Sequence, residues 1–295
     1  MKKLSILFLL IFTIFSCAKK ESINSENKNS VISVSIPPLK WITEKITGSE
    51  FTVNSVVASN ISPELFDPTI KTIEDLENSD IYLSFDLFNF EHKLEDAVSN
   101  KSKIFNVLDN KNITLIEESD EEHDASDHDH GEYDPHVWFS VNNISHIAEN
   151  IKAILSEKYP EKKDIFEKNY LNFLAEIEEF KAKSSEKIAL KKDKTFIIYH
   201  PALTYFAKDY GLKQISIEQD GKEPTAQYLT TVINEIRKNN IKILLVQPQF
   251  PKTSTETISK EVSNVKIVEF NPLDENIFEN LNKFIDSLEW LWKNI

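Results

Sequence analysis

His136, in the stretch Tyr133–Ser140, is the residue of this chain best suited to bind a metal ion. It follows Pro135, and because proline fixes its own φ and restricts the residue before it, the imidazole is presented at a defined angle. Neutral imidazole is the commonest metal ligand among side chains. The same pattern also fits a histidine satisfied by hydrogen bonds at the end of a loop, and the rest of the chain has to decide between the two.

Further side chains with ligand atoms stand in proline-containing loops elsewhere in the chain. Glu64, His200 and Asn271 each lie beside a proline and each follows a predicted strand, and Asp274 is close to the last of them. A polar residue beside a proline after a strand is usually only a turn, so each loop alone is a weak signal. Together with His136, these loops predict the rigid presentation of a small polar site.

The first part of the chain alternates between strand and helix patterns. Apolar runs predict strands at 31–36, 51–57, 80–85, 103–107 and 113–116, and the spacing of apolar residues predicts helices at 39–47 and 69–78. This alternation is typical of a mainly parallel sheet with helices on both faces.

After His136 the pattern becomes helical from 143 to 191, with a break near Tyr159 and one long helix over 165–189. Alternation then resumes, with strands predicted at 195–199, 214–217, 241–246 and 265–270 and helices at 226–239 and 276–293. The predicted fold class is α/β, with two lobes, each a mainly parallel β-sheet flanked by helices, joined by a long connecting helix. Ligands bind at the carboxyl ends of such strands, so we expect a metal site in the cleft between the lobes.

The first 17 residues have the proportions of a signal peptide. Two lysines precede an apolar run at 4–15 that is too short to cross a membrane as a helix. Cys17 is the only cysteine of the chain and therefore has no partner for an internal disulfide. The stretch 14–17 resembles a bacterial lipobox, which implies that Cys17 is lipidated. We therefore expect an exported, membrane-anchored lipoprotein, periplasmic or at the cell surface.

These patterns divide the chain into successive segments. We expect a lipoprotein signal peptide at 1–17, a flexible tether at 18–30, an N-terminal α/β lobe at 31–140, a helical linker at 141–191 and a C-terminal α/β lobe at 192–295. The N-terminal lobe includes an acidic, histidine-containing loop at 117–133.

Composition argues against several classes of function. The formal net charge of −14 argues against a nucleic-acid partner and against electrostatic binding to anionic lipid. With only four glycines, the chain has no Gly-rich phosphate loop of the P-loop or Rossmann type. An acidic chain of this kind suits a protein that attracts cations, and we expect a monomer.

Four stretches carry specific motifs: DPHVWFS at 134–140, HPALTYFAKDYGL at 200–212, EQDGKEPT at 218–225 and VQPQF at 246–250. They resemble the metal-binding receptors of bacterial zinc and manganese ABC importers, and most of all the zinc receptors. The likeness extends over residues 31–295. It implies a solute-binding protein that captures a divalent metal ion and delivers it to a membrane permease, with His136 and His200 as ligands.

Two positions depart from the pattern of this family. Glu64 stands where the family usually has histidine, and Asn271 stands where it usually has aspartate. A carboxylate oxygen suits zinc and manganese. An amide offers only a neutral carbonyl oxygen, so Asp274 or water could complete the coordination instead of Asn271. The set of His136, His200, Glu64 and Asn271 carries the same net charge as the usual three histidines and one aspartate.

The metal ion that the resemblance implies is Zn²⁺, with Mn²⁺ or iron as the alternative. The acidic loop favours zinc, because zinc receptors of the family often carry such a loop at this place. It contains His123, His128 and His130 among ten carboxylates between positions 117 and 134. We interpret it as a low-affinity collector of cations beside the cleft. A solvated run of charge without a function explains its composition equally well.

Three hypotheses from different classes remain. The leading one is a solute-binding protein that is not an enzyme. A metallohydrolase would place a zinc-bound water between His136, His200 and Glu64, and would need a general base such as Asp134 or Asp274 beside an open substrate cleft. No HExxH element supports this second hypothesis. The third is a surface adhesin whose metal ion only stabilises the fold.

Overall fold

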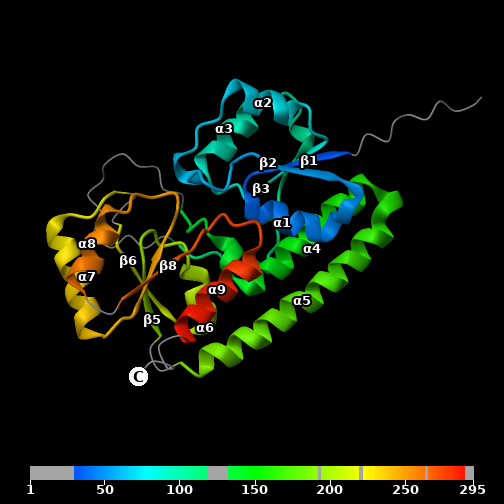
Figure 1. Ribbon diagram of the computed structural model, residues 1–295. Helices are drawn as coiled ribbons and strands as arrows, with labels where there is room; N and C mark the ends of the chain where they lie inside the picture. The colour runs from blue at the N-terminus through cyan, green and yellow to red at the C-terminus, as the bar shows by residue number, and fades with distance from the viewer. Residues whose placement is uncertain (1–29, 118–131, 192–193, 219–221, 263–264, 290–295) are drawn as a thin grey trace, which may run out of the picture.

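The computed structural model describes residues 30–117, 132–191, 194–218, 222–262 and 265–289. These residues form two four-stranded sheets in which all paired strands are parallel (Figure 1). The predicted fold class is therefore confirmed. The predicted lipidation site, Cys17, and the loop histidines His123, His128 and His130 lie outside the described residues.

The first sheet has the strand order β2-β1-β3-β4. Its strands are β1 (Val31–Val34), β2 (Thr52–Ser55), β3 (Ile81–Ser84) and β4 (Ile104–Asn106), and its helices are α1 (Pro37–Thr47), α2 (Ile70–Glu77) and α3 (Asn89–Ala97). Helix α1 begins at Pro37 rather than at the predicted Leu39. Proline suits the first turn of a helix, because its missing N–H has no intrahelical partner there.

The strand predicted at 113–116 is wrong, since this segment is irregular. Side chains take the backbone hydrogen bonds that a neighbouring strand would otherwise provide. The N–H and C=O of Thr114 bond to the side-chain amide of Asn143 at 3.0 and 2.9 Å. The N–H of Ile116 donates to the Tyr205 hydroxyl at 3.0 Å. A short apolar run cannot by itself distinguish these two outcomes.

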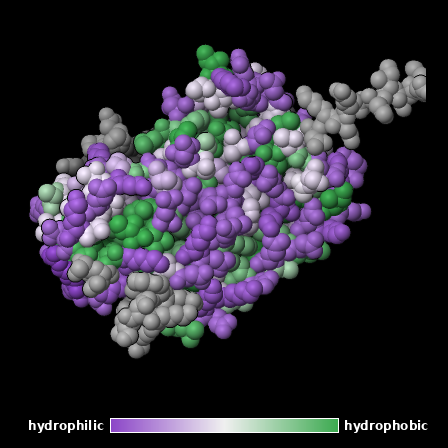
Figure 2. Space-filling view, in the orientation of Figure 1, coloured by the Kyte–Doolittle hydropathy of each residue, from purple (hydrophilic) through white to green (hydrophobic). Residues whose placement is uncertain are grey.

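Two helices connect the sheets. Helix α4 (Val141–Lys158) ends directly before Tyr159, and α5 (Lys163–Ala189) then runs for 27 residues, so the predicted break and the predicted long helix are both confirmed. Helix α5 packs against α1 and α4, and also against α9 of the second lobe (Figure 1). Hydrophilic side chains predominate over the region of α5 (Figure 2), although Ile165 and Leu171 of this helix are also exposed. No helix within the described ranges is long and apolar enough to cross a membrane.

The second sheet has the strand order β6-β5-β7-β8. Its strands are β5 (Thr195–Ile198), β6 (Lys213–Ser216), β7 (Ile243–Val246) and β8 (Lys266–Glu269), and its helices are α6 (Thr204–Tyr210), α7 (Ala226–Lys238), α8 (Thr253–Glu261) and α9 (Ile277–Glu289). The short helices α3, α6 and α8 were not among the predicted elements.

Alternation along β5 divides its side chains between two cores. Phe196 and Ile198 belong to the large core that extends through both lobes, whereas Ile197 and the next residue of the same face, Tyr199 just after the strand, belong to a smaller core of the second lobe. This is the period of two that a strand imposes on side chains. The central strands of this sheet are thus buried on both faces. A binding site can therefore form only at the ends of these strands, and ligands of such sheets bind at the carboxyl ends.

One carboxylate joins the second lobe to the start of α4. Asp209 of α6 accepts hydrogen bonds from the Ser140 hydroxyl and the Val141 N–H, both at 3.0 Å, and from the Asn142 side-chain amide at 3.4 Å. A negative charge at the first turn of a helix pairs with N–H groups that have no intrahelical partner. Asp209 therefore adds a charged acceptor to the first turn of α4, where the Ser140 hydroxyl is the N-cap and accepts the N–H of Asn143 at 3.2 Å.

We predict that Asp209→Ala lowers the free energy of unfolding by about 1–2 kcal/mol, because it leaves a helix N-terminus without its charged cap. Urea denaturation of the metal-free protein measures this loss. Asp96→Ala, which removes an exposed carboxylate at the end of α3, is the matched control and should change the stability little. Equal losses in the two variants would contradict the capping role.

Candidate metal centre

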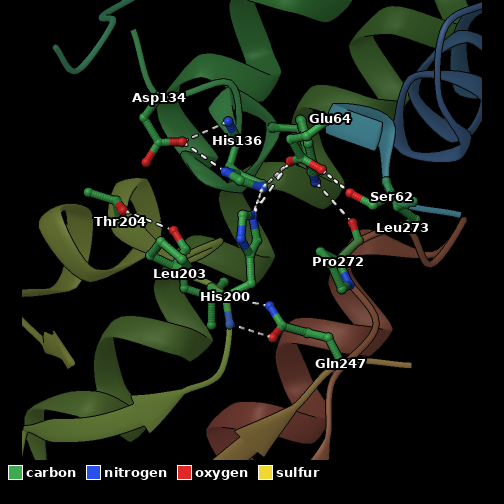
Figure 3. A network of polar contacts seen from close by, with 12 residues as sticks. Ser62, Glu64, Asp134, His136, His200, Leu203, Thr204, Gln247, Pro272 and Leu273 are labelled. Atoms are coloured by element: carbon green, nitrogen blue, oxygen red, sulfur yellow. Dashed lines mark hydrogen bonds and ion pairs between the residues drawn. The ribbon is translucent and has the colours of Figure 1, made fainter. Parts of the chain in front are cut away.

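Three of the predicted ligands meet at the carboxyl ends of the strands. Glu64 lies in a short 3-10 turn (Pro63–Leu65) that follows β2, His136 directly precedes a second such turn (Val137–Phe139), and His200 follows β5. Their side chains point toward one another from different elements (Figure 3).

The ligand atoms of these three residues are close enough to share one ion. Nε2 of His136 lies 3.2 Å from Nε2 of His200, and each of these nitrogens lies 3.5 Å from Oε1 of Glu64. Bonds of about 2.0–2.1 Å place the ligand atoms of a tetrahedral ion roughly 3.3–3.4 Å apart, whereas neighbours around an octahedral ion lie roughly 2.9 Å apart. The observed separations agree with the tetrahedral arrangement.

Asp134 determines which nitrogen of His136 faces His200 and Glu64. Its Oδ1 lies 2.9 Å from Nδ1 of His136 and also accepts the backbone N–H of His136 at 2.9 Å. The Nδ1 proton is thereby directed to the carboxylate, and Nε2 keeps its lone pair for a metal ion. Burial alone would raise the pKa of Asp134, but the hydrogen bonds with His136 outweigh it and hold the pKa below its ordinary value.

His200 has the same kind of support from a second carboxylate. Oε1 of Glu218 lies 2.9 Å from Nδ1 of His200, and the Gln247 side chain holds the backbone N–H and C=O of His200 at 2.9 and 2.8 Å. Burial would lower the pKa of His200, but the hydrogen bonds with Glu218 and Glu64 raise it to about 10. A cation that bound to His200 at neutral pH would have to displace this proton, and its affinity would therefore rise with pH.

Glu64 supplies the negative charge of the group. Its side chain is 28% exposed, and its Oε2 accepts a hydrogen bond from the Ser62 hydroxyl. Burial would raise the pKa of Glu64, but the neighbouring His200 and His136 hold it well below its ordinary range. The carboxylate is thus ionised and available as an anionic ligand.

The cavity between these ligands is small, with a volume of about 10 Å³. That is room for roughly one water-sized particle. Trp138, Phe250 and Leu273 are among the residues that line it, and the Phe250 ring stacks on the His200 imidazole with 5.0 Å between centroids. An apolar wall of this kind limits the access of water to the ligand atoms.

Asn271 is not among the residues that line the cavity. Its Oδ1 accepts hydrogen bonds from Nε2 of Gln249 at 2.6 Å and from the N–H of Leu273 at 3.0 Å, which uses both lone pairs of the amide oxygen. Asp274 is engaged in its own loop, where Oδ1 accepts the N–H of Asn276 at 2.9 Å. The structure therefore brings together Glu64 and the two histidines and leaves Asn271 outside this group.

Sequence reasoning missed the groups that orient the ligands. Glu218 and Gln247 stand in two of the quoted motifs, directly after strands, and Asp134 was considered only as a possible base. Their positions after strands were a signal that they reach the same edge of the sheet. Which histidine each one meets depends on the tertiary fold, because 18 residues separate Glu218 from its histidine.

We predict that Glu218→Gln lowers the affinity for zinc about 10- to 100-fold, because the neutral amide holds the imidazole of His200 less firmly and makes it a weaker base. Titration against a competing zinc chelator measures the affinity. Glu256→Gln, which changes an exposed carboxylate of α8 in the same way, should bind zinc like the parent protein. An unchanged affinity in Glu218→Gln would show that this carboxylate does not support the site.

Comparison with known proteins places the site in a family. A family model described as "Zinc-uptake complex component A periplasmic" matches residues 32–295. The zinc-binding lipoprotein AdcA of Streptococcus pneumoniae (strain ATCC BAA-255 / R6) is 27% identical over 305 residues, which cover 100% of this chain and 60% of AdcA. This chain therefore spans about 60% of the length of that relative.

Two further proteins match along nearly their whole length. The high-affinity zinc uptake system protein ZnuA of Bacillus subtilis (strain 168) is 26% identical over 302 residues, 98% of this chain and 92% of that protein. A crystal structure of ZnuA is similar with a TM-score of 0.79 at 30% identity, covering 88% of this chain and 97% of the other. Because the family model extends over nearly all of the sequence, this chain belongs to the zinc-uptake complex component A family.

Proposed function

We propose that this protein is the solute-binding component of a zinc ABC importer, which captures Zn²⁺ outside the cytoplasm and delivers it to the permease. The observation that carries the proposal is the convergence of Oε1 of Glu64 with Nε2 of His136 and His200, at separations of 3.2 and 3.5 Å. Membership of the family and the zinc-binding relatives support the same cargo.

The donor set favours zinc over manganese. Two imidazoles and one carboxylate are a common zinc set, with water in the fourth position of the tetrahedron. Manganese prefers more oxygen ligands than this group offers. We assign the fourth position to water, because Asn271 would have to give up one of the two hydrogen bonds that its Oδ1 accepts before it could bind the ion.

A binding protein suits this cavity better than a hydrolase. Both candidate bases are engaged elsewhere, since Asp134 bonds to Nδ1 of His136 and Asp274 accepts the N–H of Asn276. A cavity of about 10 Å³ holds an ion and is far smaller than the pockets of about 300–1,000 Å³ in which proteins enclose organic ligands. The proposal therefore includes no catalytic activity.

The acidic loop has a place in the same proposal as a collector of cations. Glu117 and Tyr133 pair in an antiparallel bridge, and the N–H of Asp134 bonds to the C=O of Ile116 at 2.9 Å. Both ends of this loop therefore lie next to Asp134, the carboxylate that orients His136. We further propose that the chain acts as an exported monomer anchored through a lipid on Cys17.

Metal content tests the proposal. The soluble form that begins at Ala18, loaded with equal zinc and manganese and then dialysed, is expected to retain one zinc ion per chain by mass spectrometry. His136→Ala should lose that ion, because the two ligands that remain, Glu64 and His200, cannot hold it through dialysis.

His146→Ala is the matched control. His146 lies on α4 beside Glu149, at 3.8 Å, and does not line the cavity, so its removal should leave the zinc content at one. Retention of manganese in place of zinc would contradict the proposed cargo. A parent protein without stoichiometric metal would contradict the transport function and favour the adhesin.

A further inference from the structure

Gln249 joins the C-terminal lobe to the loop that carries Glu64. It lies in the motif after β7 and lines the cavity. Its Nε2 donates to the backbone C=O of Ser59 at 2.7 Å and to Oδ1 of Asn271 at 2.6 Å. Building on the proposed function, we propose that Gln249 is a clasp that holds the Glu64 loop (residues 58–66) in its ligating position and thereby sets the rate of metal release.

The two histidines are fixed to the C-terminal lobe. His200 belongs to it by sequence. His136 belongs to the first half of the chain, but the Tyr205 hydroxyl donates to the C=O of Asp134 at 2.8 Å. Nε1 of Trp138 donates to the C=O of Pro272 at 3.2 Å. The stretch around His136 is therefore hydrogen-bonded on both sides to elements of the second lobe, while Trp138 also stacks on Phe85 of the first lobe with 5.7 Å between centroids. The two hydrogen bonds keep the imidazoles of His136 and His200 together as a pair.

The Glu64 loop is held by backbone bonds within itself and by Phe66, whose ring packs edge-on against Phe90 of α3 in the N-terminal lobe with 5.3 Å between centroids. The N–H of Ile61 donates to Ala58, that of Leu65 to Ser62 and that of Phe66 to Pro63, at 3.1 to 3.3 Å. Leu65 is 79% exposed, so packing contributes little at that point. The bond from Gln249 to Ser59 reaches across to the other lobe. Breaking it allows the loop to move with the N-terminal lobe, away from the two histidines.

The side-chain amide of Gln249 has a fixed orientation. Because Nε2 faces two oxygen acceptors, a flipped amide would place oxygen against oxygen at Ser59 and Asn271. In this orientation Oε1 is buried and has no hydrogen-bond partner among the described residues. A buried acceptor without a donor costs free energy, and water supplies the donor once the loop opens. The closed clasp is therefore only weakly favoured and can be reversed.

Asn271 has a role in this device. Its Oδ1 anchors the amide of Gln249, and its backbone C=O accepts from Nδ2 of Asn280 on α9 at 2.7 Å. Asn271 thus links the clasp to the body of the C-terminal lobe. It is a positioning residue for Glu64 that acts through Gln249 and Ser59.

Zinc release tests the clasp. In the full-length zinc-loaded protein, Gln249→Met preserves the length of the side chain but removes both donated hydrogen bonds. Release into an excess of chelator, followed by stopped flow, should become roughly 5- to 30-fold faster. The melting temperature of the metal-free protein should stay unchanged, because the bonds from Gln249 hold a loop rather than the core. Gln227→Met, on the exposed face of α7, should release zinc at the parent rate.

A double-mutant cycle shows whether the clasp acts through Glu64. In a Glu64→Ala background, which is kept saturated with excess zinc until mixing and is not dialysed, adding Gln249→Met should change the release rate by less than about twofold. If Gln249→Met accelerates release in that background by the same factor as in the parent protein, the proposal is overturned. It is also overturned if the single Gln249→Met variant binds one zinc and releases it at the parent rate. A parent protein that binds no zinc would instead overturn the proposed function, and the two failures are therefore distinguishable.

Discussion

Two buried carboxylates hold two imidazoles so that both Nε2 atoms face one point, and the site depends on this constraint. Asp134 and Glu218 each lie 2.9 Å from the Nδ1 of their histidine. Nitrogens that face each other at 3.2 Å repel if both are protonated and gain little if both are neutral, so a cation between them is the favourable state. In the metal-free protein the proton on His200 supplies positive charge at the same place, but it bonds the two nitrogens less strongly than a metal ion would.

The fold delivers these groups because its strands are parallel. Parallel strands end at one edge, and the loops after β2, β5, β7 and β8 bring together Glu64, His200, Gln249 and Leu273 there. The stretch with His136 comes from neither sheet. It lies between the lobes and is hydrogen-bonded to α6. The stretch therefore contacts the C-terminal lobe, although the sequence predicts that it belongs to the N-terminal lobe. In the proposed mechanism the two imidazoles stay together, and the separately held carboxylate of Glu64 controls the release of the ion.

The sequence predicted the fold well, and three of the four residues that it singled out as candidate ligands, Glu64, His136 and His200, lie together in the structure. The alternation of apolar strand patterns with helix patterns predicted parallel sheets, and a proline beside each candidate ligand indicated rigid loops at strand ends. It failed where tertiary contacts replace local pattern. The segment 113–116 has the composition of a strand, but Asn143 and Tyr205 take its backbone bonds. Asn271 has a ligand atom, but Gln249 occupies it. Neither partner can be recognised from the local sequence.

X-ray absorption at the zinc edge, on the zinc-loaded protein, tests the central claim most directly. We predict a four-coordinate ion with two imidazole nitrogens and two oxygens at about 2.0–2.1 Å, from His136, His200, Glu64 and water. The scattering of one imidazole should disappear in His136→Ala. An ion with six oxygen-rich ligands, or a spectrum that is unchanged in this variant, would contradict the account.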